Sequence, residues 1–190
     1  MRCSPELLLP LITLVAGVTA LAQGPGYHLG RAASEAEIKA WDTAVGPAGK
    51  ELPPGSGTAR EGAQIFKEKC ASCHGQNAEK GGRFAVLVGG KGTLQDVKPV
   101  KSIGSYYPFA TTVWDYIYRN MPPQQERSLP ADEVYAVTAF LLYKNDIIKE
   151  DEVINAESLP KIRMPNRDGF IPPWPPEYKP RQKRPFGIYP

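Results

Sequence analysis

The segment Cys70-Ala71-Ser72-Cys73-His74 limits what this chain can fold into more than any other part of its sequence. The pattern Cys-x-x-Cys-His is the attachment signature of a c-type haem. In such a site the two cysteines form thioethers with the haem vinyl groups, and the adjacent histidine is the proximal ligand of the iron. We therefore expect Cys70, Cys73 and His74 to hold one covalent haem c, with much of the chain folded around it.

Two other kinds of cysteine site fit the sequence less well. A structural zinc site needs four Cys or His ligands, and the cysteines and histidines of this chain are Cys3, Cys70, Cys73, His28 and His74. A redox dithiol needs no adjacent histidine and usually lies beside a βαβ pattern, which the surrounding sequence does not resemble. The dithiol remains as the alternative hypothesis.

The first 22 residues are typical of a secretory signal peptide. Arg2 precedes an apolar run from Leu7 to Val18, and Ala20-Leu21-Ala22 then supplies a small-residue cleavage site. The run of about a dozen residues is short for a membrane span, which needs about 20. We expect residues 1–22 to be removed on export to the periplasm, with no stable membrane insertion. An uncleaved anchor is the alternative.

The sequence after the signal divides into an arm, a domain and a tail. Residues 23–57 are expected to form an N-terminal arm with one short helix, because Ser34 and Glu37 have the spacing of a capping box. A Pro- and Gly-rich stretch then breaks regular structure. Residues 58–148 are expected to form an all-α domain, and residues 149–190 a Pro-rich basic tail.

The first helix of the domain is expected to lead into the haem motif. Thr58 and Glu61 have the capping-box spacing at its start. Phe66 and Cys70 follow at helical intervals on one face. Gly62 costs about 1 kcal/mol of helix stability relative to Ala, so its expected use is a close helix crossing.

Two further helices are expected before the tail. The segment 110–120 has an apolar face, and Pro122 disfavours helical backbone at the residue before it, so Met121 should lie on a loop. A last helix begins near Pro130. Its segment Val134 to Tyr143 is apolar except for Thr138, which predicts burial on more than one side.

The second axial ligand of the iron is expected to be a methionine, the usual partner of histidine in cytochromes c. Met121 and Met164 are both followed by Pro. Met121 is favoured because it lies between two expected helices of the domain, whereas Met164 lies in the tail. Met164, His28 and an open iron site remain as alternatives.

The end of the chain carries most of the positive charge. The segment Leu159 to Pro190 contains seven Lys or Arg against Asp168 and Glu177, a net charge of +5, together with nine prolines. A stiff basic segment with interleaved aromatic residues could dock on a partner protein. A disordered, solvated end is the alternative. Nucleic acid is excluded as a partner because the chain is expected to be exported.

The domain resembles the class I cytochromes c. The resemblance rests on the helix with Gly62 and Phe66, the motif Cys70 to His74, Met121-Pro122, and a closing helix with Ala139-Phe140-Leu141. It implies that the first and last helices cross beside the haem, with Phe66 near Phe140.

A narrower resemblance covers nearly the whole exported chain. The chain is similar to the cytochrome subunits of sulfite and sulfane dehydrogenases in four places: Leu29 to Arg31, Leu52 to Thr58, Trp114 to Ile117 with Asn120 to Pro122, and Met164 to Phe170. Those subunits accompany a molybdenum subunit of the sulfite-oxidase family. Because this chain has one Cys-x-x-Cys-His motif, the resemblance favours a single-haem sulfite dehydrogenase type.

The expected function is electron transfer. The resemblance implies that the haem accepts electrons from the molybdenum subunit and passes them to a downstream carrier. No residue is assigned to substrate chemistry, because no paired carboxylates or activated nucleophile can be identified. The alternatives are an independent soluble electron shuttle and, less favoured, a haem-based sensor or peroxidase with an open iron site.

Overall fold

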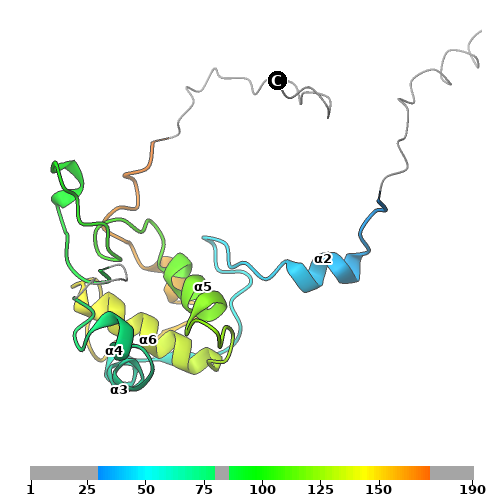
Figure 1. Cartoon of the computed structure of the whole chain (residues 1–190), viewed down its shortest axis with the longest axis horizontal. Helices are drawn as coiled ribbons and strands as arrows, with labels where there is room; N and C mark the ends of the chain where they lie inside the picture. The colour runs from blue at the N-terminus through cyan, green and yellow to red at the C-terminus, as the bar shows by residue number, and fades with distance from the viewer. Residues whose placement is uncertain (1–29, 80–85, 172–190) are drawn as a thin grey trace, which may run out of the picture. The chain divides into compact units, whose positions relative to one another are not determined.

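The computed structural model describes residues 30–79 and 86–171 of the 190-residue chain. The expected signal peptide, His28 and the last part of the expected tail lie outside the described residues. The chain divides into two compact units, residues 1–43 and 44–190, and each is described by itself (Figure 1). Among the described helices, none has the length and apolar character to cross a bilayer.

The first unit contains the helix α2 (Glu35–Trp41). The predicted capping box is confirmed: the Ser34 hydroxyl accepts a hydrogen bond from the Glu37 amide at 3.3 Å, and the Glu37 carboxylate accepts one from the Ser34 amide at 2.8 Å. Arg31 also donates to this carboxylate at 2.7 Å. None of the residues of α2 is buried.

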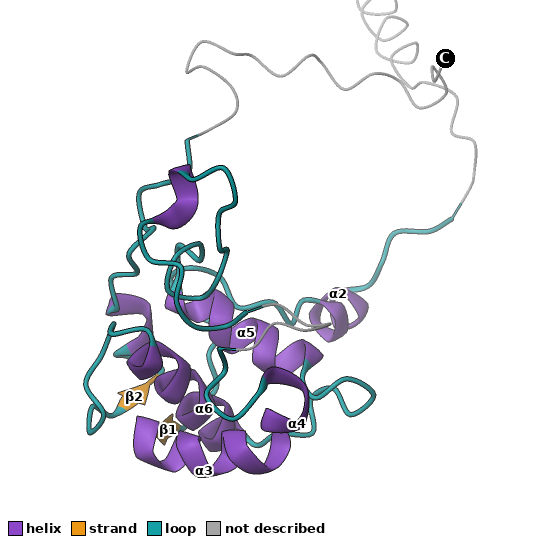
Figure 2. Cartoon of the chain, turned by 60° about the vertical axis from the view of Figure 1, so that its left-hand side comes forward, coloured by secondary structure: helices purple, strands orange, loops and turns teal. Residues whose placement is uncertain are grey.

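The second unit is mostly helical, as predicted (Figure 2). Its elements in chain order are β1 (Ser56–Gly57), α3 (Ala59–Lys69), α4 (Ala71–His74), η3 (Thr93–Gln95), α5 (Ala110–Asn120), α6 (Ala131–Lys144), β2 (Ile154–Asn155) and η4 (Leu159–Lys161). The helix α6 lies between α3 and α5. The two short strands pair antiparallel.

The crossing of α3 and α6 is as close as the sequence predicted. A Cβ atom on Gly62 would overlap the backbone carbonyl of Ala136 in α6. One turn further along, the rings of Phe66 and Phe140 lie with their centroids 5.0 Å apart. Glycine therefore permits the contact that sets the position of the haem motif, which begins directly after α3.

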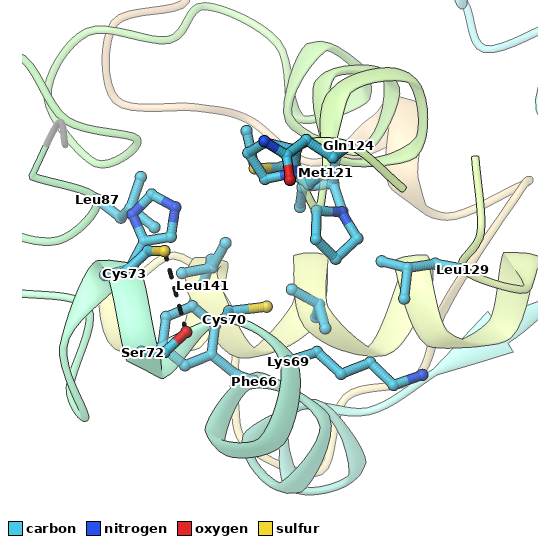
Figure 3. Close-up of a pocket in the computed structure, with 15 residues that line it drawn as sticks. Phe66, Lys69, Cys70, Ser72, Cys73, Leu87, Met121, Gln124, Leu129 and Leu141 are labelled. Carbon is cyan, nitrogen blue, oxygen red and sulfur yellow. Dashed lines mark hydrogen bonds between the residues drawn. The ribbon is translucent and has the colours of Figure 1, made fainter. Parts of the chain in front are cut away.

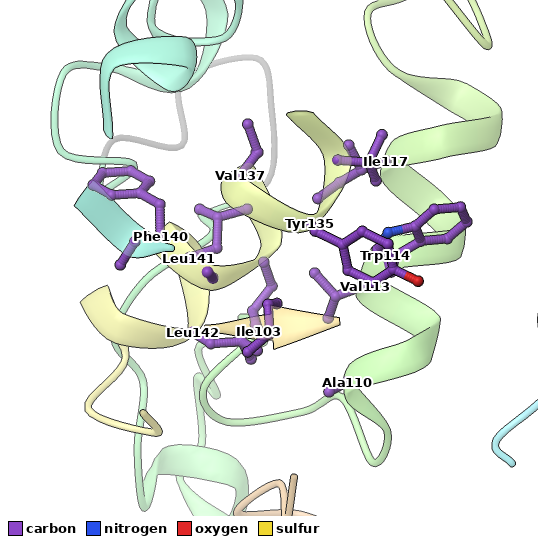
Figure 4. Packing of buried hydrophobic residues seen from close by; sticks show 14 of the residues in the cluster. Ile103, Ala110, Val113, Trp114, Ile117, Tyr135, Val137, Phe140, Leu141 and Leu142 are labelled. Carbon is purple, nitrogen blue, oxygen red and sulfur yellow. The ribbon is translucent and has the colours of Figure 1, made fainter. Parts of the chain in front are cut away.

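Nearly all of α6 is buried, also as predicted. Every residue from Val134 to Leu142 is inaccessible to solvent or nearly so. Figure 4 shows Trp114 of α5 against Tyr135 of α6, and their ring centroids are 5.4 Å apart. The helix α5 ends at Asn120, and Met121 follows with an extended backbone, which confirms the effect predicted for Pro122.

Residues before α3 and after α6 also belong to the core of this unit. Leu52 lies in the core before it, and Ile154, Leu159 and Met164 lie in the core after it. The strand pair joins Gly57 to Ile154. The described part of the expected tail is therefore anchored on this chain, whereas the composition had suggested a segment extended from Leu159 onward.

Candidate haem site

The haem motif adopts one turn of helix at the end of α3. The amides of Cys73 and His74 both donate to the carbonyl of Cys70, at 3.2 and 3.0 Å. Residues three and four apart lie on the same face of a helix. The spacing of the motif therefore brings both thiols and the imidazole to one surface.

That surface lines a cavity of about 380 Å³ (Figure 3). Cys70, Cys73, His74 and Met121 all line it. Many of its other walls are apolar, and they include Phe66, Leu87, Ile117, Leu129, Val137 and Leu141. The volume lies in the range of cofactor sites, roughly 300–1,000 Å³.

A smaller lobe of about 170 Å³ shares part of this lining. The shared residues are His74, Leu87, Ile117, Met121 and Leu141, and the lobe adds Ile103, Tyr107, Val113 and Tyr116. Neither cysteine lines the smaller lobe. The two lobes therefore share the wall that these five residues form, and this wall includes both His74 and Met121.

Both cysteines of the motif are free thiols. Cys70 is half-buried and Cys73 is exposed. Burial raises the pKa of the Cys70 thiol to about 11, against a smaller lowering by the neighbouring Lys69. The Ser72 hydroxyl lies 3.9 Å from the Cys73 sulfur (Figure 3). Neither thiol is consumed by a disulfide, so both can form thioethers.

An ion pair lies at the rim of the larger lobe. Lys69, which lines the lobe, donates to Glu133 at 2.6 Å and so links the end of α3 to the first turn of α6. Both side chains are partly exposed, so the pair contributes on the order of 0–1 kcal/mol to stability.

The two candidate methionines occupy different environments. Met121 lines both lobes together with His74. Met164 is 1% exposed, belongs to the hydrophobic core and lines neither lobe. The geometry favours Met121 as the ligand opposite His74, and this assignment stays a prediction.

The residues present fit a covalently attached haem. Two thiols, an imidazole and a thioether face one largely apolar space, which is the donor set of a cytochrome c. Within the described residues, no group of three His, Cys, Asp or Glu side chains could hold a metal ion. The donor set is therefore unlike that of a zinc site.

Sequence analysis missed the two tyrosines that line the smaller lobe. Tyr116 lies one turn after Val113 and beside Ile117, so helical spacing could have placed it on the same face of α5. Tyr107 precedes α5 and has no periodic signal. Burial raises the pKa of the Tyr107 phenol, and the neighbouring phenols of Tyr116 and Tyr106 raise it further.

Comparisons with known proteins define the class. Residues 57–141 match the family described as cytochrome C oxidase, cbb3-type, subunit III. A chain in the crystal structure of the sulfane dehydrogenase SoxCD from Paracoccus pantotrophus is 48% identical, with 77% of this chain and 72% of that chain covered and a TM-score of 0.69. A search of curated proteins found no significant match.

The chain belongs to the c-type cytochromes of class I, proteins that transfer electrons through a haem. Within this class it resembles the cytochrome component of a sulfane dehydrogenase. The family, the all-α fold and the electron-transfer role expected from the sequence are thereby confirmed.

Proposed function

We propose that this chain is a periplasmic, single-haem cytochrome c that accepts electrons from a molybdenum subunit of the sulfite-oxidase family and delivers them to a downstream carrier. One observation carries the proposal. Cys70, Cys73, His74 and Met121 line one cavity in a chain that is 48% identical to part of a sulfane dehydrogenase.

These four residues have two roles in the proposal. Cys70 and Cys73 attach the macrocycle, and His74 and Met121 ligate the iron. A bound haem supplies reversible one-electron chemistry. A thioether ligand and apolar walls both favour the reduced form, and so raise the reduction potential. The protein therefore tunes and orients the cofactor, and it has no assigned substrate chemistry of its own.

The single Cys-x-x-Cys-His motif supports one haem per chain. One haem holds one electron. Oxidation of sulfite releases two electrons, so the haem would have to be reoxidised between two transfers from the molybdenum centre. This makes the downstream carrier part of every catalytic cycle.

Copurification tests the proposal against the electron-shuttle alternative. The native protein is purified from periplasm under mild conditions, and haem and molybdenum are measured in the same fractions. We expect one haem per chain and molybdenum that coelutes with it. A chain that elutes alone, with haem and without molybdenum, would support the independent shuttle.

Rapid mixing provides the functional arm of the test. The purified complex is mixed with sulfite, or with a sulfane-sulfur substrate, while the haem absorbance is followed. We expect substrate-dependent haem reduction in the complex and none in the isolated cytochrome chain. Reduction of the isolated chain by substrate would contradict the division of labour.

The docking of the C-terminal tail on a partner, expected from its charge and proline content, can be tested by truncation. Because Leu159 and Met164 are buried in this unit, the cut should fall after Ile171. Residues 172–190, which lie outside the described residues, hold four of the seven basic residues counted above. We expect normal haem spectra with weaker complex formation. Unchanged affinity would remove this segment from the interface.

A further inference from the structure

An exposed patch of apolar and basic side chains lies where the loop before α5 meets the segment after η4. The Tyr106 ring meets that of Phe170 edge-on at 5.3 Å, and the Lys101 ammonium lies 5.2 Å from the centre of the Tyr106 ring. All three residues are exposed, and Phe170 is 51% exposed. Their sequence neighbours Val100 and Ile171 are exposed as well. We call these five residues the aromatic patch.

The aromatic patch is held in place by the fold beneath it. The Asn166 amide donates to the Tyr106 carbonyl at 2.8 Å, and the Arg167 guanidinium lies 4.2 Å from the centre of the Phe109 ring. Met164, at the start of the same segment, is buried in the core. A surface that is already ordered loses less entropy when it binds a partner. Exposed aromatic residues on such a surface are typical anchors of a protein interface.

The aromatic patch also lies next to the wall of the haem cavity. The ring of Tyr106 meets that of Tyr107 edge-on at 6.4 Å, and Tyr107 lines the smaller lobe. Two side chains, Tyr106 and Tyr107, therefore separate a partner at this point of the patch from the space proposed for the haem. Because electron transfer slows steeply with distance, a surface this close to the cofactor is suited to the docking of an electron donor.

The charge around the aromatic patch favours an acidic partner. Residues 91–101 contain three lysines against Asp96, a net charge of +2. Residues 172–190, which follow the patch directly in the chain, contain four basic residues against Glu177, a net charge of +3. Opposite charge on a partner speeds association and fixes the orientation in which the two surfaces meet.

We propose that the aromatic patch docks on an acidic surface of the molybdenum subunit, with Phe170 as its main apolar anchor. This inference rests on the proposed function and names the surface through which the haem receives its electrons. The molybdenum subunit is favoured over the downstream carrier, because stable complexes bury more apolar surface than transient electron-transfer encounters do.

The test compares haem-loaded variants of the full chain in their binding to the purified molybdenum subunit. Phe170→Ala removes the apolar anchor, and Tyr143→Ala is its control, because Tyr143 is an exposed aromatic residue of α6 outside the patch. Lys101→Glu reverses a charge of the patch, and Lys149→Glu reverses the charge of an exposed lysine elsewhere. Haem absorbance and the near-infrared sulfur-to-iron band check that each variant keeps its cofactor and its axial ligand.

We expect Phe170→Ala to weaken binding about tenfold, as for an interface anchor. Lys101→Glu should slow association severalfold at low salt and less at high salt. Both variants should show slower substrate-dependent haem reduction when the molybdenum subunit is below saturation, with unchanged reoxidation by the downstream carrier. The two control variants should behave as the unsubstituted protein does.

Three results would overturn the inference while the proposed function stands. The first is binding and haem reduction in Phe170→Ala and Lys101→Glu equal to those of the controls. The second is slower reoxidation with unchanged haem reduction, which would assign the aromatic patch to the downstream carrier. The third is a concentration-dependent dimer that Phe170→Ala abolishes, which would assign it to a second copy of this chain. A native protein without a molybdenum partner would overturn the proposed function, and the inference with it.

Discussion

The helices α2 and α3 both begin with a capping box, but only α3 packs into the core. In both capping boxes the side-chain hydroxyl accepts from the third amide at 3.3 Å, and the glutamate accepts from the cap amide at 2.8 Å. Yet α2 buries no residue, and Trp41 is 88% exposed, whereas α3 packs Ala59, Gly62 and Phe66 into the core.

The difference shows that a cap starts a helix but does not stabilise a fold. A cap satisfies backbone amides that would otherwise lack partners. Tertiary contacts make α3 part of the fold, because most helix stability in proteins comes from a packed face. Substitutions in the two helices should separate these contributions.

The largest effect is expected for Gly62→Ala. Alanine is the better helix former by about 1 kcal/mol, but its Cβ would overlap the Ala136 carbonyl. We expect a net loss of roughly 1–3 kcal/mol in the free energy of unfolding, as for other overpacked sites, measured by denaturant titration. Gly46→Ala is the control, since a Cβ there would meet only Glu51 at 3.5 Å. Equal stability of both variants would contradict the close crossing.

Thr58→Ala should have the next largest effect. It removes the α3 cap, which typically costs about 1 kcal/mol. Because α3 is part of the core, we expect this loss to appear in global unfolding, followed through the haem absorbance. Thr58→Ser keeps the hydroxyl and should retain most of the stability. A loss confined to local fraying would show that the α3 cap is uncoupled from the fold.

Ser34→Ala should leave global unfolding unchanged. The substitution removes an equivalent cap from α2, but no buried contact depends on that helix. We expect loss of helical chemical shifts at Ile38 and Trp41 by NMR. The unfolding curve followed by haem absorbance should not change. A shift of that curve as large as in Thr58→Ala would mean that α2 is stabilised by the packed unit.

The smallest effect is a pH dependence of α2. Hydrogen bonds from Arg31, and then from Ser34, lower the pKa of Glu37 to about 2 from its ordinary value of 4.5. The charged form is favoured in the helix, so its contribution is complete above about pH 4.5 and is lost as the pH falls through about 2. We expect the α2 amide shifts to titrate in this window, and Glu37→Gln to abolish the titration. A titration that persists in Glu37→Gln would assign the effect to another group.

Local signals were sufficient to predict several features. Both capping boxes, the end of α5 before Pro122 and the use of Gly62 each depend on neighbouring residues alone. The spacing of Cys70 to His74, and the position of Met121 between helices, also singled out residues that line one cavity in the structure. Their role as the haem donor set stays a prediction.

Other features depend on contacts distant in sequence. Ile154, Leu159 and Met164 are buried at intervals that match neither a helix nor a strand, so proline and charge dominated the interpretation of that segment. The pairing of Gly57 with Ile154 involves strands of two residues, too short to leave a pattern. Tyr107 lines the smaller lobe from the loop before α5, where no periodic pattern marks it in the sequence.

The ligation of the haem is tested most directly by one matched pair of variants. Met121→Leu and Met164→Leu make the same substitution, which nearly conserves volume and so limits damage to the core. The measurement is the weak near-infrared sulfur-to-iron band of the oxidised protein. We predict that the band disappears in Met121→Leu and is retained in Met164→Leu. Retention in Met121→Leu with loss in Met164→Leu would contradict the assignment of the axial ligand.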